Sequence, residues 1–159
     1  MPLLINLRHL EKKPLELRGE LAATELELDG IDELIHVTQP LKHDLVAQLL
    51  GRDVLVQGRL QLGLQCECAR CLKPFVKQLE LEHWAAHLPL EGEDQVVIKN
   101  DCVDLTPFLR EDILLQFPQH PLCEPECRGL QQQAPPAGGG VEQSANSASA
   151  WAALDKLKL

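Results

Sequence analysis

Residues 54 to 68 carry the feature that most constrains the fold, a period-two alternation fifteen residues long. Even positions from Val54 to Leu64 are apolar or glycine, and most odd positions carry glutamine, arginine or glutamate. A β-strand sends alternate side chains to opposite faces, so one face of this strand is buried and the other meets water. Leu55 and Gly63 are the two odd positions in this stretch that do not carry a polar side chain. Burial on one face only is typical of antiparallel sheets.

Weaker patterns of the same kind flank this strand. A hairpin turn is predicted at 51–53, and the alternation resumes at Phe75 after a connection from Cys68 to Pro74. Further strands are predicted over residues 15–21, 33–38, 41–49 and 96–100.

A helix is predicted to follow the strands. Thr106 is the expected N-cap, with Pro107 at the first helical position. Leu105, Leu109 and Ile113 recur every four residues, and the helix is expected to end before Pro118. The predicted class is α+β: a meander-like antiparallel sheet with one main amphipathic helix.

Composition divides the chain into three parts. Residues 1–130 are predicted to form a single α+β domain with cysteine knuckles. Residues 131–149 hold one charge and little to bury, which predicts a disordered linker. Residues 150–159 are predicted to form a short helix, which can dock back on the domain or on a partner. Its apolar residues at helical spacing are Trp151, Leu154 and Leu157.

Charge and hydropathy limit the environment. The formal net charge is −9, so any nucleic-acid contact needs a local basic patch. The N-terminus has no signal-peptide pattern and no stretch approaches the length of a membrane helix. We therefore expect a cytoplasmic protein without a membrane partner. There, six cysteines are expected to be metal ligands or buried thiols rather than disulfides.

Four of the cysteines have ligand spacing. Cys68 and Cys71 form C-x2-C, and Cys123 and Cys127 form C-x3-C, with 51 residues between the pairs. Short turns of this kind let one backbone present two thiolates to one ion, so the sequence predicts a structural zinc site that clamps a hairpin tip to the segment after the helix. Cys66 shares the apolar face and is assigned to the core.

Two other interpretations of these cysteines stay open. The four thiols can be reduced and packed together at a sheet end. Alternatively, Cys68 and Cys71 can be a redox pair, with Arg70 and Lys73 favouring a thiolate, although thioredoxin-like pairs lie at a helix N-terminus and this one lies between strands.

Basic residues gather near the cysteine hairpin, and they are candidates for contacts with RNA or a protein partner: Arg59, Arg70, Lys73 and Lys77. Aromatic residues make up only 3% of the chain, and single-stranded RNA binding relies on stacking aromatics. The negative charge favours a basic protein partner. No spacing supports a Ser/His/Asp arrangement, no phosphate-binding loop is present, and no small-molecule substrate is expected.

Three segments together resemble one known family: CARCLKPF, DLTPFLREDILLQFPQHPLC and CEPECRGL. They are similar to the YceD family of large ribosomal RNA subunit accumulation proteins. The terminal tryptophan-containing A-L-x-x-L segment is similar too. One departure is that Gln131 follows Leu130 where many relatives continue with further cysteines.

The resemblance implies a non-enzymatic bacterial or plastid factor for synthesis, processing or stability of 23S (large-subunit) ribosomal RNA. Its partners would be that RNA or ribosomal and assembly proteins. Two alternatives from other classes remain: a thiol-disulfide redox protein that uses the C-x-x-C, and a zinc-stabilised interaction module with no ribosomal role.

Overall fold

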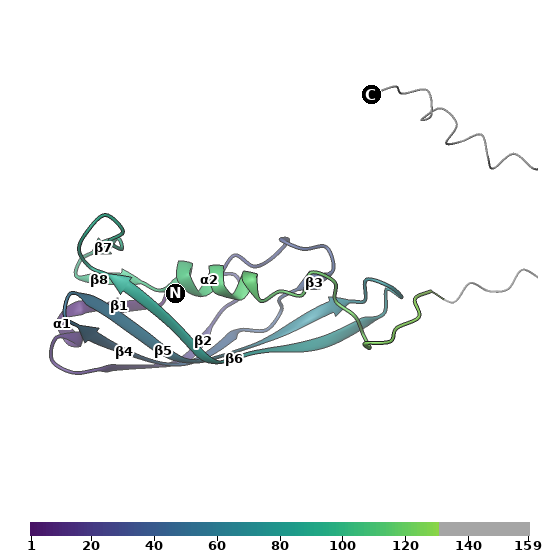
Figure 1. The fold of residues 1–159 in the computed structure, drawn as a ribbon, viewed down its shortest axis with the longest axis horizontal. Coiled ribbons are helices and arrows are strands. Elements are labelled where there is room, and N and C mark those ends of the chain that lie inside the picture. Colours follow the sequence, from purple (N-terminus) through teal and green to yellow (C-terminus); the bar gives the residue numbers. More distant parts are fainter. Residues whose placement is uncertain (131–159) are drawn as a thin grey trace, which may run out of the picture.

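The computed structural model describes residues 1–130 (Figure 1). Two antiparallel sheets and two helices make up this part of the chain. The predicted linker at 131–149 and the predicted helix at 150–159 lie outside the described residues. The elements, in chain order, are β1 (Leu4–Asn6), α1 (Leu7–Leu10), β2 (Leu15–Leu21), β3 (Ile35–His36), β4 (Leu41–Leu50), β5 (Asp53–Glu67), β6 (Pro74–Pro89), β7 (Ile98–Lys99), β8 (Cys102–Asp104) and α2 (Thr106–Leu115).

The five-stranded sheet is built around β5. One side of β5 pairs with β4 over residues 53–61 and then with the short β3, and its other side pairs with β6 along almost its whole length. β2 lies beyond β4. The predicted alternation is confirmed, because Val54, Val56 and every even position from Leu60 to Cys66 are buried.

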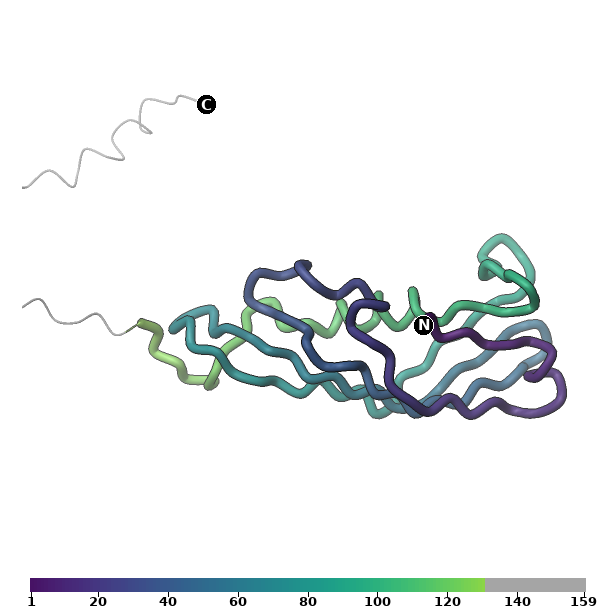
Figure 2. Tube along the Cα trace, turned by 180° about the vertical axis from the view of Figure 1, so that it is seen from behind, coloured from purple at the N-terminus to yellow at the C-terminus, as the bar shows by residue number. Residues whose placement is uncertain are grey.

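Within residues 1–130, the five-stranded sheet is covered on one face only. α2, the small sheet β1-β8-β7 and the loop between β2 and β3 lie over its inner face (Figures 1 and 2). Leu28 of that loop joins Leu109 and Ile113 of α2 in one apolar core with the inner residues of the strands. The result is the two-layer arrangement that buries one face of an antiparallel sheet and leaves the other in water.

A bulge changes the phase of β6. Two residues of β6, Glu82 and His83, stand opposite the single Arg59 of β5. Before the bulge the buried residue is at an odd position, Leu79, and after it the buried residues are at even positions, beginning with Trp84. The sequence alternation therefore stops at Glu82, although the strand runs on to Pro89.

Two sequence predictions need correction. Thr106 is not the N-cap but the first residue of α2, because its hydroxyl accepts the Leu3 backbone N–H at 3.0 Å and its own N–H bonds to Asp104. The strand predicted over 33–38 is only two residues long, because only Ile35 and His36 lie in register with β5, opposite Cys66 and Gln65. In residues 1–130, neither helix has the length and apolarity that crossing a membrane requires.

Candidate metal centre

The first cysteine pair sits in the turn of the β5–β6 hairpin. Cys68 follows the last residue of β5, and the turn is closed by hydrogen bonds from Cys68 N to Lys73 O at 3.0 Å and from Leu72 N to Cys68 O at 2.9 Å. Leu72 adopts a left-handed backbone conformation with φ of 59°. Such a conformation costs a non-glycine residue about 1–2 kcal/mol, so the turn is held by its surroundings.

The second pair lies in the segment after α2, which runs back along the hairpin tip. The Ala69 N–H donates to Pro121 O at 2.8 Å, and Arg70 Nη1 donates to Cys127 O at 2.9 Å. A local bond from Cys127 N to Glu124 O, at 3.1 Å, shapes the second turn. Backbone contacts thus join two segments that are far apart in the sequence.

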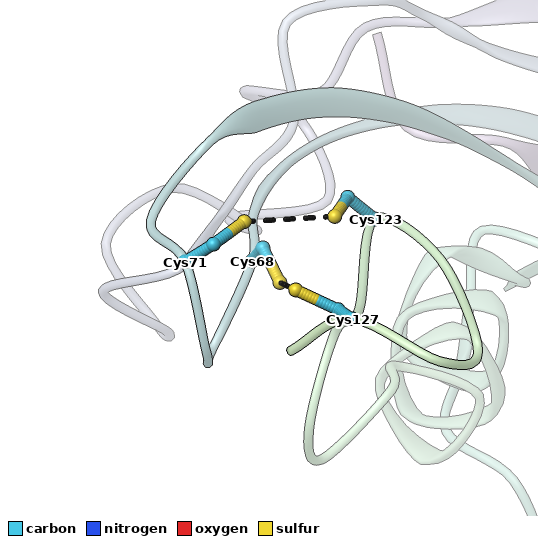
Figure 3. A group of neighbouring side chains, drawn as sticks. All are labelled: Cys68, Cys71, Cys123 and Cys127. Carbon is cyan, nitrogen blue, oxygen red and sulfur yellow. Dashed lines mark hydrogen bonds between the residues drawn. The ribbon is translucent and has the colours of Figure 1, made fainter. Parts of the chain in front are cut away.

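The four cysteines converge at this junction, as Figure 3 shows. The Sγ atoms of Cys68, Cys71, Cys123 and Cys127 all lie within 4.8 Å of one another. Cys68 Sγ is 3.7 Å from Cys127 Sγ, and Cys71 Sγ is 3.6 Å from Cys123 Sγ. Sulfurs around a tetrahedral zinc ion, with Zn–S of about 2.3 Å, are about 3.8 Å apart. The predicted convergence is confirmed, and its geometry suits a four-coordinate metal.

The other candidate ligands stay outside the group. Cys66 is buried in the core, as predicted, and burial raises the pKa of its thiol. Cys102 lies in β8 of the small sheet. Among residues 1–130, no histidine belongs to a cluster that could hold a metal.

The cluster holds its protons unevenly. The backbone N–H of Cys71 lowers the pKa of Cys68 to about 6, against the effect of burial and with help from the backbone N–H groups of Cys123 and Arg70. The Cys71 sulfur, followed by burial, raises the pKa of Cys123 to about 12. The cluster therefore favours one thiolate and resists the ionisation of all four, as expected where like charges crowd without a cation. A divalent metal removes that conflict and displaces the protons.

The predicted contact residues do not form one patch. Arg70 and Lys73 are in the hairpin turn, while Lys77 pairs in register with the buried Leu64 and so lies on the inner side of the hairpin. Arg59 lies on the outer face, in register with Asp44, which also accepts a hydrogen bond from Arg18. Arg59 is thus part of a charge-alternating row across the sheet.

Sequence reasoning missed one basic residue of the tip. Arg128 lines a cavity of about 580 Å³ beside the cysteines, together with Lys73, Glu124 and Glu126. Arg128 directly follows Cys127 in the sequence, and this position could have indicated that it lies at the tip. If four thiolates held Zn²⁺ here, the site would carry a net charge of −2 and would offset part of the basic charge around the tip.

Comparison with known proteins supplies the class of this α+β chain with a four-cysteine cluster. The family model described as large ribosomal RNA subunit accumulation protein YceD matches residues 56–158, more than half of the chain. This chain belongs to the YceD family. The match includes β5 from residue 56 onward, β6, α2 and both cysteine pairs.

Individual relatives have no described function. An uncharacterized protein of Mycobacterium tuberculosis is 29% identical over 143 residues, which cover 81% of this chain and 67% of that protein. The uncharacterized protein YlbN of Bacillus subtilis is 29% identical over 90 residues, which cover 52% of this chain and 49% of that protein. No solved structure gives a significant match.

Proposed function

We propose that this chain is a non-enzymatic factor needed for the synthesis, processing or stability of large-subunit ribosomal RNA. The observation that carries the proposal is membership of the YceD family, whose description names that RNA. The chain would act in the cytoplasm through RNA or through a protein of the assembling subunit. Deleting the gene should lower mature large-subunit RNA and free large subunits, and re-expression should restore both. Unchanged RNA and subunit profiles in the deletion strain would reject the role.

A zinc ion in the four-cysteine cluster would hold the hairpin tip against the segment after α2. The cluster supports this through its sulfur separations and through its four soft ligands, which suit Zn²⁺. Freshly purified protein should contain one zinc per chain, and Cys123→Ser should lose it. Cys66→Ser is the matched control, because Cys66 lies outside the cluster and should leave the zinc content unchanged.

A protein partner fits the charges better than RNA. The tip carries basic and acidic residues in similar numbers, and the filled zinc site adds negative charge. The whole chain has a net charge of −9, which complements basic ribosomal proteins. Pull-down with and without ribonuclease separates the two: a protein partner should persist after digestion, and an RNA-mediated one should not.

One observation favours thiol-disulfide chemistry as a second candidate: the lowered pKa of Cys68, about 6. Its burial argues against that role, since Cys68 is 0% exposed and a redox nucleophile must reach its substrate. Insulin reduction by metal-free protein tests this candidate. Activity that is lost in Cys68→Ser would support it, and inert thiols would remove it.

A further inference from the structure

Leu115 is an apolar residue that the core does not use. It is 80% exposed at the end of α2, whereas Ile113, two residues earlier, is fully buried. Leu114 packs partly against the core. The segment EDILL therefore ends in a leucine that points away from the interior, although the residues around it are fixed by the fold.

Leu115 borders a notch between α2 and the outer edge of β6. Within residues 1–130, no strand pairs with that edge. Trp84 Nε1 donates to Asp112 Oδ2 at 2.7 Å and fixes the helix beside the strand. The notch has a volume of about 350 Å³, and the side chains of Leu81, Trp84 and Ala85 contribute apolar surface to it.

The notch is also acidic. Glu80, Glu82 and Asp112 line it, and among its lining residues only His83 can carry a positive charge. An occupant that complements this surface needs apolar side chains on one side and lysine or arginine beside them.

We infer that residues 150–159 of the same chain dock in this notch. This segment has Trp151, Leu154 and Leu157 at helical spacing, and Lys158 lies beside that stripe. Docking would bury Leu115 under the apolar stripe and bring Lys158 to the carboxylates. It would also cover the open edge of β6, which otherwise offers unpaired backbone groups to other strands. The inference is independent of zinc and of the ribosomal role.

The length of the chain permits this docking. The described part ends at Leu130, fifteen residues after Leu115, so the two are at most about 50 Å apart. The 19 residues from 131 to 149 span up to about 65 Å when extended. A larger cavity of about 590 Å³ lies beside β7, β8 and the start of α2, but it is near the end of the molecule opposite Leu130 and lacks a cluster of carboxylates (Figure 1).

Nuclear magnetic resonance on the full-length protein tests the contact directly. We expect nuclear Overhauser effects between the Trp151 ring and the Leu115 methyl groups. Leu115→Glu should abolish them and weaken docking about tenfold or more, the change expected when a buried leucine becomes a charged residue. Leu50→Glu is the matched control, because Leu50 is 52% exposed at the end of β4 and away from the notch; it should leave the contacts intact.

Exchanging the charges of one notch carboxylate and one lysine of the segment provides a second test. Recovery of the contacts in the double variant would not be expected if the first substitution had only disturbed the fold. Glu82→Lys should weaken the contacts, and adding Lys158→Glu to the same chain should restore them in part. The absence of Trp151–Leu115 contacts in the wild type would overturn the inference and leave the notch open to a separate basic partner. Contacts seen only between differently labelled copies would also overturn it, because the occupant would then be a second molecule.

Discussion

The β5–β6 hairpin passes through two regions that are built differently. In the first, which we call the body, residues 53–61 of β5 lie between β4 and β6, and their buried side chains share one apolar core with α2. In the second, the tip, which lies beyond the stretch paired with β4, the two residues of β3 are the only ones in the described part of the chain that pair with the other side of β5 (Figure 1). The body is held by aliphatic burial throughout, whereas in the tip the apolar core ends at Cys66 and the four clustered sulfurs lie beyond it.

This difference separates the roles of core and metal. The body has a continuous apolar core and does not need an ion to fold. The tip has exposed apolar residues, including Leu72 and Val76, and a strained turn, so we expect its order to depend on the proposed metal clamp. Mutations in the body should therefore act on global stability, and mutations in the tip should act on metal affinity and local order.

The largest effect is expected from Gly58→Ala in the body. A Cβ at Gly58 would collide with the Asp44 carbonyl oxygen and lie 2.8 Å from Leu45 Cα, so β4 and β5 would have to separate. We expect a loss of more than about 3 kcal/mol in the free energy of unfolding, measured by urea denaturation.

Gly63→Ala, in the same strand, is the matched control. There the new methyl group meets only the flexible end of the Gln39 side chain, which can move. Its cost should stay within about 1 kcal/mol. Equal losses for the two alanine variants would contradict the assigned backbone contact.

Acid should break the tip while leaving the body folded. Cys123 keeps its proton at neutral pH because its pKa is about 12, so a binding zinc ion must displace that proton. Zinc affinity should therefore fall at least about tenfold for each unit of pH decrease between 8 and 6. Competition with a zinc-chelating dye measures this, and an affinity that does not change with pH would contradict it.

The metal-free tip has its own pH dependence. The Cys68 pKa is lowered from 9.0 to about 6, so the thiolate stabilises the fold fully above pH 9, and this contribution is lost progressively until pH has fallen through about 6. Hydrogen exchange of the hairpin amides in zinc-free protein should therefore accelerate, relative to the intrinsic rates, as pH falls from about 9 to about 6, and should level off below that. The amides of β4 and the first half of β5 should not change in this way.

The sequence predicted those parts of the fold whose signal is local. The alternation of β5 and the spacing of the two cysteine pairs each lie within a few residues, and both predictions hold. The second half of β6 was missed because the bulge at Glu82 and His83 reverses the phase of burial. The Thr106 cap was wrong because Leu3, 103 residues away, takes its hydroxyl. Contacts between residues that are far apart in the sequence produce no periodic pattern in it, so they could not be predicted.

The site shows the same limit. The identity and spacing of the cysteines predicted the candidate metal ligands. The hydrogen bond from Arg70 to Cys127 O could not be predicted, because the two residues come together only in the folded chain. Arg59 was grouped with the tip by its place in the sequence, whereas strand pairing puts it opposite Asp44.

A moderate effect on the body is expected from Trp84→Phe. The substitution removes the N–H that donates to Asp112 and leaves space under α2, because Trp84 is only 6% exposed. We expect a loss of about 2–3 kcal/mol in unfolding free energy. The loss should be the same with and without a zinc chelator. A loss that appears only in zinc-loaded protein would show that body and tip are coupled.

The smallest effect is expected from Arg70, and it should appear only at the tip. Its guanidinium ties the first knuckle to the second through Cys127 O at 2.9 Å. Arg70→Ala should speed zinc loss to a chelator several-fold with little change in unfolding free energy, because one exposed hydrogen bond contributes little to global stability. Arg70→Lys should show a smaller acceleration, since a lysine can still reach the carbonyl with one donor.

Lys73→Ala is the control for the Arg70 variants. It should leave the rate of zinc loss unchanged if the effect comes from the hydrogen bond rather than from the positive charge of the tip. Equal acceleration by Arg70→Ala and Lys73→Ala would assign the effect to charge and return Arg70 to the group of partner-contact candidates.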